Sequence, residues 1–289
     1  MDRYAVIGHP IGHSLSPRIH TLFAQATGQA LTYTAIEAPL DGFAATVDAF
    51  RAAGGRGLNV TLPFKVEACA YADEVSERAR IAGAANALAF DGPRCRAENF
   101  DGVGLVRDIT VNLGQPVAGR RVLVLGAGGA ARGALPSLLQ AAPAALVVAN
   151  RSVAKAEALV LALQGHGVGH GVLAACGYAD LALHPPFDIV INATAASLGD
   201  ETLPLPPAVF APTTLAYDMV YGKGLTPFLR QARAAGAARL ADGLGMLVEQ
   251  AAESFAWWRG VRPDTRPVID ELAVALIKPR ALPFPCTAP

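Results

Sequence analysis

The chain has no excess of charge, no long apolar run and no closely spaced pair of cysteines. Among its 289 residues, 24 basic and 24 acidic side chains cancel, which removes the attraction that nucleic acid or an anionic membrane surface would exert. No apolar run approaches the roughly 18 residues that span a bilayer, and no signal peptide is recognisable before the strand-like run Tyr4–Ile7. We therefore expect no nucleic-acid partner, no membrane association and a small-molecule ligand.

The cysteines and histidines also exclude some chemistry. The cysteines include no C-x-x-C pair, which favours reduced thiols in a cytoplasmic protein; they are Cys69, Cys95, Cys176 and Cys286. His9 and His13 are interrupted by a proline and a glycine, and His166 and His170 have no acidic or cysteine partner nearby. Because a metal site needs a converging set of ligands, the sequence predicts no metal.

What the chain does have is a regular alternation of apolar runs of strand length with longer segments of helical period. This pattern is typical of an α/β fold with mainly parallel sheets, and the length of 289 residues favours two domains. We predict an N-terminal α/β domain over residues 1–102 and a doubly wound parallel-sheet domain over residues 103–245. The helices within residues 246–280 are expected to pack back on the first domain.

The expected elements follow from this pattern. In the first half we predict three strands, four helices and a hairpin: strands Arg3–Gly8, Leu31–Ala38 and Gly57–Thr61; helices Ser16–Gly28, Leu40–Ala53, one from Pro63 and Asp101–Leu113; and the hairpin of Asn86–Phe90 with Arg94–Phe100. In the second half we predict strands Arg121–Leu125, Ala145–Ala149, Asp188–Ala193 and Leu215–Val220 with helices between them, then helices Met246–Arg259 and Pro267–Lys278.

A glycine-rich turn follows the first strand of the second half. Gly126 permits a tight turn, Gly128 allows backbone amides to approach a pyrophosphate, and the small Ala131 lets strand and helix pack closely. The helix N-terminus then points at the phosphates. The strand before the turn and the helix after it predict a Rossmann-type dinucleotide-binding unit, the alternative being a bare structural turn, with cofactor contacts expected at Gly126, Ala127, Gly128, Gly129 and Ala130.

The end of the next strand indicates which dinucleotide binds. An NAD-binding unit usually has Asp or Glu there, about 20 residues past the glycines, whereas this chain has Asn150, Arg151 and Ser152, with Lys155 one turn further on. Arg151 can pair with a 2′-phosphate, and Ser152 can cap the following helix while donating a hydrogen bond. The sequence therefore predicts NADP as cofactor. The alternative is that Arg151 and Lys155 form an ordinary solvated face.

Several motifs in fixed order carry a resemblance to a known family. They are Gly12-His-Ser14-Leu-Ser16-Pro17, Asn59-Val-Thr61-Leu-Pro63-Phe64-Lys65, Gly83-Ala-Ala-Asn86, Asn99-Phe100-Asp101-Gly102, the Gly-rich turn, Asn150-Arg151-Ser152, Asn192-Ala193-Thr194, Tyr217-Asp218-Met219-Val220-Tyr221 and Ala241-Asp242-Gly243-Leu-Gly245-Met246-Leu-Val-Glu-Gln250. Together they resemble the shikimate dehydrogenase family of shikimate and quinate dehydrogenases over nearly the whole chain.

The resemblance implies an enzyme and a set of site residues. It implies reversible, NADP-linked interconversion of 3-dehydroshikimate and shikimate, with the first domain binding the substrate, a small polyhydroxylated carboxylic acid. Separately from the resemblance, we expect a cytoplasmic protein that is a monomer or a homodimer. Substrate contacts are implied at Ser14, Ser16, Asn59, Thr61, Asn86, Asp101, Tyr221 and Gln250, and further cofactor contacts at Thr194, Met219 and Gly243. Any one of these polar residues can instead be a cap or turn former, and Ser16 before Pro17 has the pattern of an N-cap.

Lys65 and Asp101 are the predicted catalytic pair, and their residue types support this independently. The chain has only four lysines against 20 arginines, so it favours arginine wherever a positive charge alone would suffice. Lys65 is therefore informative, because lysine can lose its proton and arginine in practice cannot. If Pro63 begins a helix, Lys65 lies in the first turn, where the positive end of the dipole disfavours a cation. Asp101, at the start of another helix, can hold the amine in position.

Two departures from the family pattern leave alternatives open. The chain has Ala87 and Phe100 where the family typically has threonine, and these changes beside substrate positions are expected to reshape the pocket. The rival functions are an NAD-linked quinate/shikimate dehydrogenase and a non-catalytic ligand sensor. The pair Trp257-Trp258 is interpreted as core and interface packing rather than a base-stacking surface.

Overall fold

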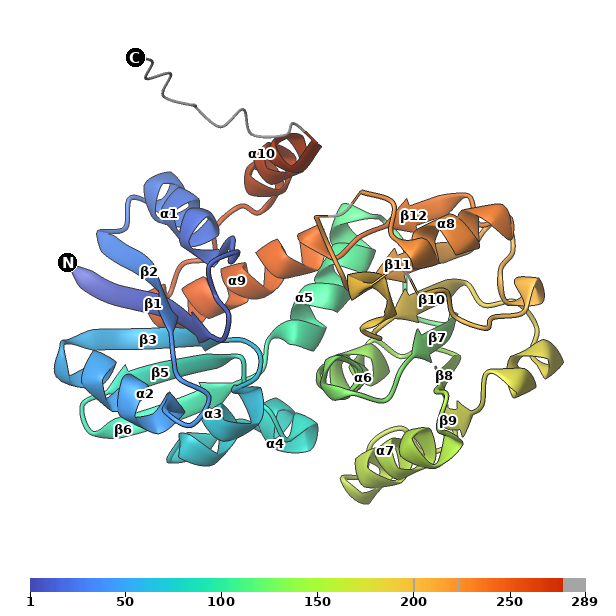
Figure 1. The fold of residues 1–289 in the computed structure, drawn as a ribbon, viewed down its shortest axis with the longest axis horizontal. Helices are drawn as coiled ribbons and strands as arrows, with labels where there is room; N and C mark the ends of the chain where they lie inside the picture. The colour runs from blue at the N-terminus through green and yellow to red at the C-terminus, as the bar shows by residue number, and fades with distance from the viewer. Residues whose placement is uncertain (200, 223, 278–289) are drawn as a thin grey trace, which may run out of the picture.

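Two sheets of six strands each organise the chain, one in each of two lobes (Figure 1). The structure is a computed structural model that describes residues 1–199, 201–222 and 224–277. The first sheet has the strand order β2-β1-β3-β5-β6-β4 and the second has the order β12-β11-β10-β7-β8-β9. Within the described ranges, no helix is both long and apolar enough to cross a membrane.

The strands of the first sheet are β1 (Asp2–Gly8), β2 (Leu31–Glu37), β3 (Gly55–Val60), β4 (Glu74–Val75), β5 (Ala87–Asp91) and β6 (Arg94–Glu98). Those of the second are β7 (Arg121–Leu125), β8 (Ala145–Ala149), β9 (Leu173–Cys176), β10 (Ile189–Asn192), β11 (Leu215–Asp218) and β12 (Arg239–Ala241). The α-helices are α1 (Ser16–Thr27), α2 (Phe43–Ala52), α3 (Lys65–Tyr71), α4 (Glu77–Ala82), α5 (Asp101–Arg107), α6 (Gly129–Gln140), α7 (Val153–Gly165), α8 (Pro227–Ala234), α9 (Leu244–Arg259) and α10 (Arg266–Ile277).

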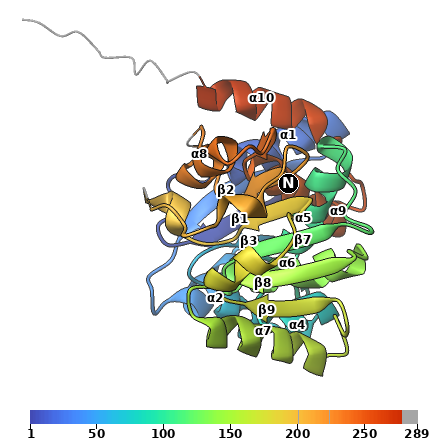
Figure 2. The same ribbon diagram turned by 90° about the vertical axis from the view of Figure 1, so that its right-hand side faces the viewer.

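The second sheet is parallel throughout. Read from β9 to β12, its strands follow the order third, second, first, fourth, fifth, sixth, which is the order of a doubly wound dinucleotide-binding sheet. Figure 2 shows β7, β8 and β9 side by side, with α7 beside β9. Residues 122–125 of β7 are fully buried, as expected for a strand that helices cover on both faces. This confirms the predicted fold class.

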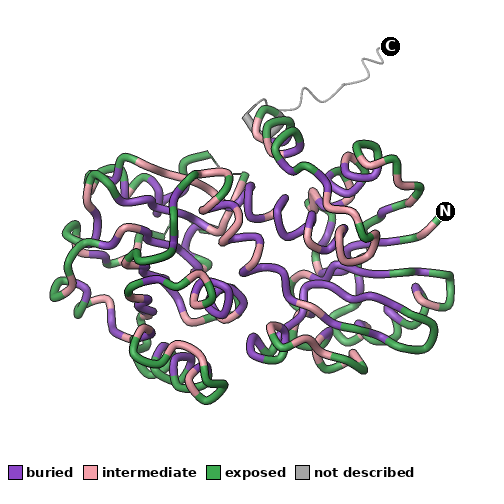
Figure 3. The backbone as a smooth tube through the Cα atoms, turned by 180° about the vertical axis from the view of Figure 1, so that it is seen from behind, coloured by how far each residue is buried: buried purple, intermediate pink, exposed green. Residues whose placement is uncertain are grey.

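The first sheet is mixed. Strand β1 pairs in parallel with β2 and β3, while β5 runs antiparallel to β3 and β6. The predicted hairpin is therefore confirmed as β5 and β6, in which Asp91 pairs with Arg94 across the turn. Buried backbone follows the central strands of both sheets in Figure 3. Because parallel neighbours end at the same edge, the ends of β1 and β3 carry their following loops to one side of the lobe.

Helices α5 and α9 pack against each other between the lobes (Figure 1). Gly104 makes this close approach possible, because a Cβ there would lie 2.7 Å from the Gln250 backbone nitrogen and 2.9 Å from the Met246 carbonyl oxygen. Helix α9 also contacts α1 and β3, and α10 contacts α1 and α9. The last helices thus lie against elements of the first half, while the proposed boundary at residue 102 falls inside α5.

Some predicted elements were wrong in detail. The helix expected from Pro63 begins at Lys65, because Thr61–Phe64 form a turn closed by the Phe64 N–H on the Thr61 carbonyl at 3.0 Å. The helix expected over Asp101–Leu113 changes at Asp108 into a π-helical segment, Asp108–Asn112. The helix expected from Leu40 begins at Phe43.

Other differences concern elements that the pattern missed. The strands β4, β9 and β12 and the helix α4 are all short, of two to six residues, and carry too little periodicity to be predicted. The last predicted helix begins one residue early, at Arg266, and Lys278 lies outside the described residues. Both tryptophans are partly buried and pack on the first lobe: Trp258 stacks on Tyr4 at 4.8 Å and its indole N–H donates to the Leu88 carbonyl at 3.0 Å, while Trp257 packs against Phe100.

Candidate active site

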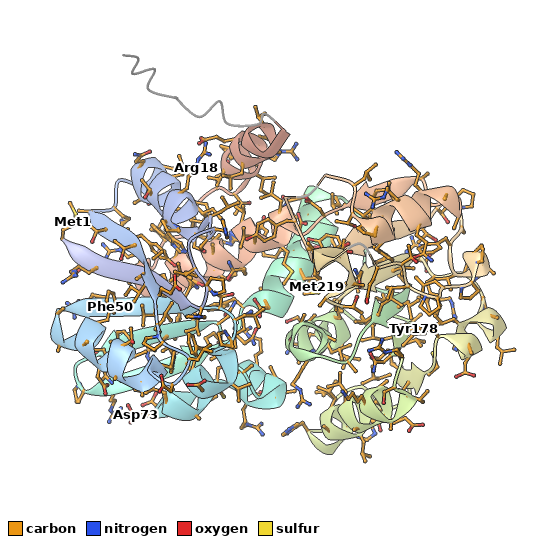
Figure 4. All side chains as sticks on the ribbon, in the orientation of Figure 1. Met1, Arg18, Phe50, Asp73, Tyr178 and Met219 are labelled. Carbon is orange, nitrogen blue, oxygen red and sulfur yellow. The ribbon has the colours of Figure 1, made fainter. Side chains whose placement is uncertain are left out.

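A cavity of about 290 Å³ lies between the first sheet and the end of β11. Its lining includes all nine residues predicted to contact the substrate or to act in catalysis, namely Ser14, Ser16, Asn59, Thr61, Lys65, Asn86, Asp101, Tyr221 and Gln250. Met219 and Gly243, predicted for the cofactor, line the same cavity. Met219 lies between the two lobes (Figure 4). The structure thus brings together residues from elements and loops that are far apart in sequence.

The cavity wall is made mostly by segments that follow strands or begin helices. Asn59 lies near the end of β3 and Thr61 directly after it, while Lys65 begins α3 and Asp101 begins α5. Tyr221 comes shortly after β11. Short polar side chains gather at such positions because strand ends and helix N-termini leave backbone groups and side chains free to meet a ligand.

Ser14 and Ser16 lie at the N-terminus of α1. The helix begins at Ser16 with Leu15 as N-cap and has no side-chain cap, so the expectation of Ser16 as an N-cap is wrong. The Ser14 hydroxyl oxygen accepts from the Ser16 N–H at 3.3 Å, which leaves its own O–H free to donate. No acidic residue lies in the first turn. This end of α1 therefore favours an anion by its dipole and by its hydroxyls.

Lys65 and Asp101 form an ion pair inside the cavity. The Lys65 Nζ donates to Asp101 Oδ2 at 2.6 Å, and the two side chains are 27% and 11% exposed. Lys65 lies in the first turn of α3, as predicted, even though Pro63 does not begin that helix. The Asp101 backbone N–H donates to the Asn99 side chain at 3.0 Å, which fixes the start of α5. The pair is half-buried, with access to water through Lys65.

Asn86 connects this pair to α9. Its Nδ2 donates to Asp101 Oδ1 at 2.8 Å and to Gln250 Oε1 at 3.1 Å, and its Oδ1 accepts from the Phe100 N–H at 2.8 Å. Asn86 is only 2% exposed, so these bonds form away from bulk water, where leaving one unmade is costly. Both carboxylate oxygens of Asp101 therefore have a fixed donor.

Ala87 and Phe100 do not line the cavity. Ala87 is fully buried in β5, opposite Glu98. Phe100 packs edge-on against Trp257 at 5.8 Å, and the Arg78 guanidinium lies 5.7 Å from its ring. The two departures therefore lie outside the described cavity lining, and the expected change in the pocket stays a prediction.

The glycine-rich turn leaves open space beside the N-terminus of α6. Gly126 has φ of +103°, and a Cβ there would lie 2.9 Å from the Thr194 methyl carbon, so only glycine fits. At Gly128 and Gly129 a Cβ would meet nothing within 4 Å, and α6 has no side-chain cap. Free N–H groups beside open space suit a pyrophosphate.

The end of β8 presents a basic, exposed surface. Arg151, Ser152 and Lys155 are exposed, and the Asn150 Nδ2 donates to the Ser152 carbonyl at 2.9 Å, which shapes the turn into α7. Ser152 is the N-cap residue of α7, but its side chain accepts no capping hydrogen bond, so the capping part of that prediction is wrong. Its hydroxyl is available to a ligand. The donors present fit the 2′-phosphate of NADP better than a bare ribose.

Met219 and Gly243, two residues predicted to contact the cofactor, lie against each other in the cavity wall. A Cβ on Gly243 would lie 2.3 Å from the Met219 carbonyl oxygen, so a side chain cannot be placed there. Thr194, after β10, donates its hydroxyl to Asn192 Oδ1 at 2.7 Å. This arrangement places a surface suited to a dinucleotide next to the Lys65–Asp101 pair.

No role was predicted for several residues that shape the site, although Asn99 and His13 belong to motifs that carry the resemblance. Asn99, Tyr33 and Ser254 hold cavity residues from outside, and His13 lines the cavity. The partners of Tyr33 and Ser254 are distant in sequence, so no local signal identifies them. In the part of the chain that the structure describes, no group of three or more His, Cys, Asp or Glu residues could hold a metal.

Three family models match the chain. The shikimate dehydrogenase substrate binding domain matches residues 6–88, shikimate / quinate 5-dehydrogenase matches residues 109–199, and the shikimate 5′-dehydrogenase C-terminal domain matches residues 243–273. A relative from Aromatoleum aromaticum named shikimate dehydrogenase (NADP(+)) is 59% identical over 272 residues, which are 94% of this chain and 97% of the relative. The chain belongs to the shikimate dehydrogenase family.

Solved structures of other proteins share the fold of this chain over nearly its whole length. The crystal structure of an Ael1 enzyme from Pseudomonas putida is 60% identical with a TM-score of 0.90, covering 94% of this chain and 98% of its own. The shikimate 5-dehydrogenase of Thermus thermophilus, solved with NADP(H) and shikimate, is 33% identical with a TM-score of 0.83, covering 96% of this chain and 100% of its own. The predicted family is thus confirmed.

Proposed function

We propose that this protein is an NADP-dependent shikimate dehydrogenase that interconverts 3-dehydroshikimate and shikimate by reversible hydride transfer. The observation that carries the proposal is the Lys65–Asp101 pair, 2.6 Å apart, in a small cavity bounded on one side by Met219 and Gly243. The names of the relatives, shikimate dehydrogenase (NADP(+)), support both the substrate and the cofactor.

NADP supplies the hydride chemistry when it is bound, and the protein supplies position and the proton. When shikimate is oxidised, its reacting carbon loses a hydride to the cofactor and its hydroxyl loses a proton. We assign that proton to the Lys65 Nζ, which accepts it as a neutral amine, and the Asp101 carboxylate pairs with the ammonium that results. Because the Lys65 side chain is 27% exposed, the proton can pass on to water. Reduction runs the same steps in reverse.

The remaining polar residues of the cavity are proposed to hold the substrate. We assign the carboxylate of the substrate to Ser14 and Ser16, where α1 has free hydroxyls and no acidic residue in its first turn. Hydroxyl and amide groups suit the ring hydroxyls of a small acid, and for these we propose Asn59, Thr61, Asn86, Asp101, Tyr221 and Gln250. The cavity of about 290 Å³ is of the size such an acid needs.

The cofactor is proposed to extend from the glycine-rich turn to the cavity. Its pyrophosphate is assigned to the turn and the start of α6, its 2′-phosphate to the end of β8, and its nicotinamide to the residues beside the cavity. The proposed contacts are Gly126, Ala127, Gly128, Gly129, Ala130, Asn150, Arg151, Ser152, Lys155, Thr194, Met219 and Gly243. In this division, residues 1–102 with the last helices bind the substrate and residues 103–245 bind NADP.

One experiment separates this function from its rivals. Purified protein is assayed by NADPH or NADH absorbance with each pair of cofactor, NADP⁺ or NAD⁺, and substrate, shikimate or quinate. We expect the highest kcat/KM with NADP⁺ and shikimate. A preference for NAD⁺ and quinate would instead identify the catabolic type of dehydrogenase, and no turnover with any pair would identify a ligand sensor. The cytoplasmic location and the monomeric or homodimeric state remain predictions.

A further inference from the structure

The side-chain amide of Asn59 is held by three partners inside the protein. Its Oδ1 accepts from the Tyr33 hydroxyl at 2.7 Å, and its Nδ2 donates to the Asn86 backbone carbonyl at 3.2 Å and to Ser254 Oγ at 2.8 Å. Because a backbone carbonyl can only accept a hydrogen bond, the Nδ2 of Asn59 must face the Asn86 carbonyl. The Asn59 oxygen must then face Tyr33, and Tyr33 must be the donor.

These bonds continue to the catalytic pair. Asn86, whose backbone carbonyl accepts the hydrogen bond from Asn59, donates from its side chain to Asp101 Oδ1 at 2.8 Å. Asp101 Oδ2 in turn accepts from Lys65 Nζ at 2.6 Å. Asn59 and Asn86 line the cavity, whereas Tyr33 does not. A continuous series of hydrogen bonds therefore runs from the buried Tyr33 through Asn59, Asn86 and Asp101 to Lys65.

The ring of Tyr33 is fixed by His20. The two rings are parallel within 4° with centroids 4.1 Å apart, and both side chains are buried. Burial lowers the pKa of His20 to about 3, an effect that the nearby Asn59 amide only partly offsets, and burial raises the pKa of Tyr33 well above its ordinary value. The imidazole is therefore neutral and the phenol keeps its proton, as a donor to Asn59 must.

We propose that Tyr33 is a positioning residue of the active site, which fixes the Asn59 amide by hydrogen bonding and thereby holds Asn86 and Asp101 opposite Lys65. The proposal rests on the proposed function, because its readout is the dehydrogenase reaction. Its chemical basis is the cost of a buried acceptor without a partner: without the Tyr33 hydroxyl, the Asn59 oxygen loses the donor that fixes it, in a residue that is only 5% exposed.

The test compares Tyr33→Phe with Tyr4→Phe. Tyr4 pairs with Tyr33 in the register of β1 and β2, is also buried, and its hydroxyl has a long 3.5 Å contact with Arg259. We expect kcat/KM for shikimate to fall roughly 5- to 100-fold in Tyr33→Phe and to stay within about twofold of wild type in Tyr4→Phe. The Kd for NADP⁺, measured by calorimetry, is expected to be unchanged in both, because neither residue is among the proposed cofactor contacts.

A double-mutant cycle shows whether Tyr33 acts through Asn59. Adding Tyr33→Phe to Asn59→Ala is expected to cause little further loss, because the amide on which Tyr33 acts is already gone. Ser254→Ala, which removes a different partner of that amide, provides a second background that keeps the test open if Asn59→Ala does not fold. There we expect the double variant to lose less than the product of the two single effects.

The outcomes are distinct. An inactive wild-type protein would contradict the proposed function. An active wild type, with Tyr33→Phe no different from Tyr4→Phe, would overturn the positioning role alone. Purely multiplicative effects on kcat/KM in both cycles would also overturn it. So would a loss of kcat/KM in Tyr33→Phe that the lower melting temperature of the variant accounts for entirely.

Discussion

Asp101→Asn removes one charge from the active site and almost nothing from its shape. In the wild type, Asp101 Oδ2 accepts from Lys65 Nζ at 2.6 Å and Oδ1 accepts from Asn86 Nδ2 at 2.8 Å. An asparagine has only one oxygen, so its NH₂ group must face one of these two donors. Either Lys65 or Asn86 then loses its partner, and the lysine amine is no longer held by a carboxylate.

The expected size of the effect follows from burial and chemistry. The side chains of Lys65 and Asp101 are 27% and 11% exposed, so the cost lies between that of a surface ion pair, about 0–1 kcal/mol, and that of a broken buried pair, about 3–5 kcal/mol. We expect a loss of about 1–2 kcal/mol in the free energy of unfolding. Loss of a positioned proton-transfer group typically reduces turnover by about 10²- to 10⁴-fold, and we expect kcat to fall within that range.

Glu98→Gln provides a matched control. Glu98 pairs with Arg78 at 2.9 Å, with side chains 12% and 34% exposed, and does not line the cavity. Both variants are assayed for kcat with NADP⁺ and shikimate, for the Kd of NADP⁺ and for urea-induced unfolding. We expect similar losses of stability but retention of most turnover in Glu98→Gln. Equal losses of turnover in the two variants, or wild-type turnover in Asp101→Asn, would refute the assignment of Asp101.

Three other variants probe the cofactor surface, the packing between the lobes and the buried histidine. Arg151→Ala should raise the Kd of NADP⁺ by about 10-fold or more and leave that of NAD⁺ unchanged, since the exposed guanidinium at the end of β8 is assigned to the 2′-phosphate; an unchanged cofactor preference in calorimetry would count against it. Gly104→Ala places a Cβ 2.7 Å from the Gln250 backbone nitrogen, so it should cost about 1–3 kcal/mol in urea unfolding, and wild-type stability would show that α5 and α9 can separate. His20, whose pKa burial lowers from 6.5 to about 3, is protonated more readily in the unfolded chain, so its contribution to stability is present above about pH 6.5 and falls as the pH drops toward 3. Between about pH 7 and pH 5 this amounts to about 2 kcal/mol, and His20→Phe should remove that part of the pH dependence; the same pH slope in both proteins would contradict it.

The sequence predicted the features that depend on local pattern. The alternation of strands and helices, the glycine turn at Gly126 and the hairpin at Asp91 each have a signal within a few residues. The cavity residues come from segments far apart in sequence, and the family resemblance was needed to collect them. The structure then placed all nine in one lining.

The sequence could not predict features that depend on tertiary contacts. Tyr33 reads as an ordinary strand tyrosine until β2 lies beside β1 and its hydroxyl meets Asn59, 26 residues away. Ser254 meets the same amide from 195 residues away. The position of the Phe100 ring could not be predicted either, because its sequence neighbour Asp101 enters the cavity while the turn into α5 sends the ring against Trp257.

The central claim is that Lys65 and Asp101 move the proton while NADP carries the hydride, and the kcat of Lys65→Ala tests it most directly. The variant is compared with wild type in the NADP⁺-linked oxidation of shikimate, with folding checked by circular dichroism and NADP⁺ binding by calorimetry. We predict an active wild type and a folded, NADP⁺-binding variant whose kcat is lower by about 10²- to 10⁴-fold. A folded Lys65→Ala protein with wild-type turnover would contradict the claim.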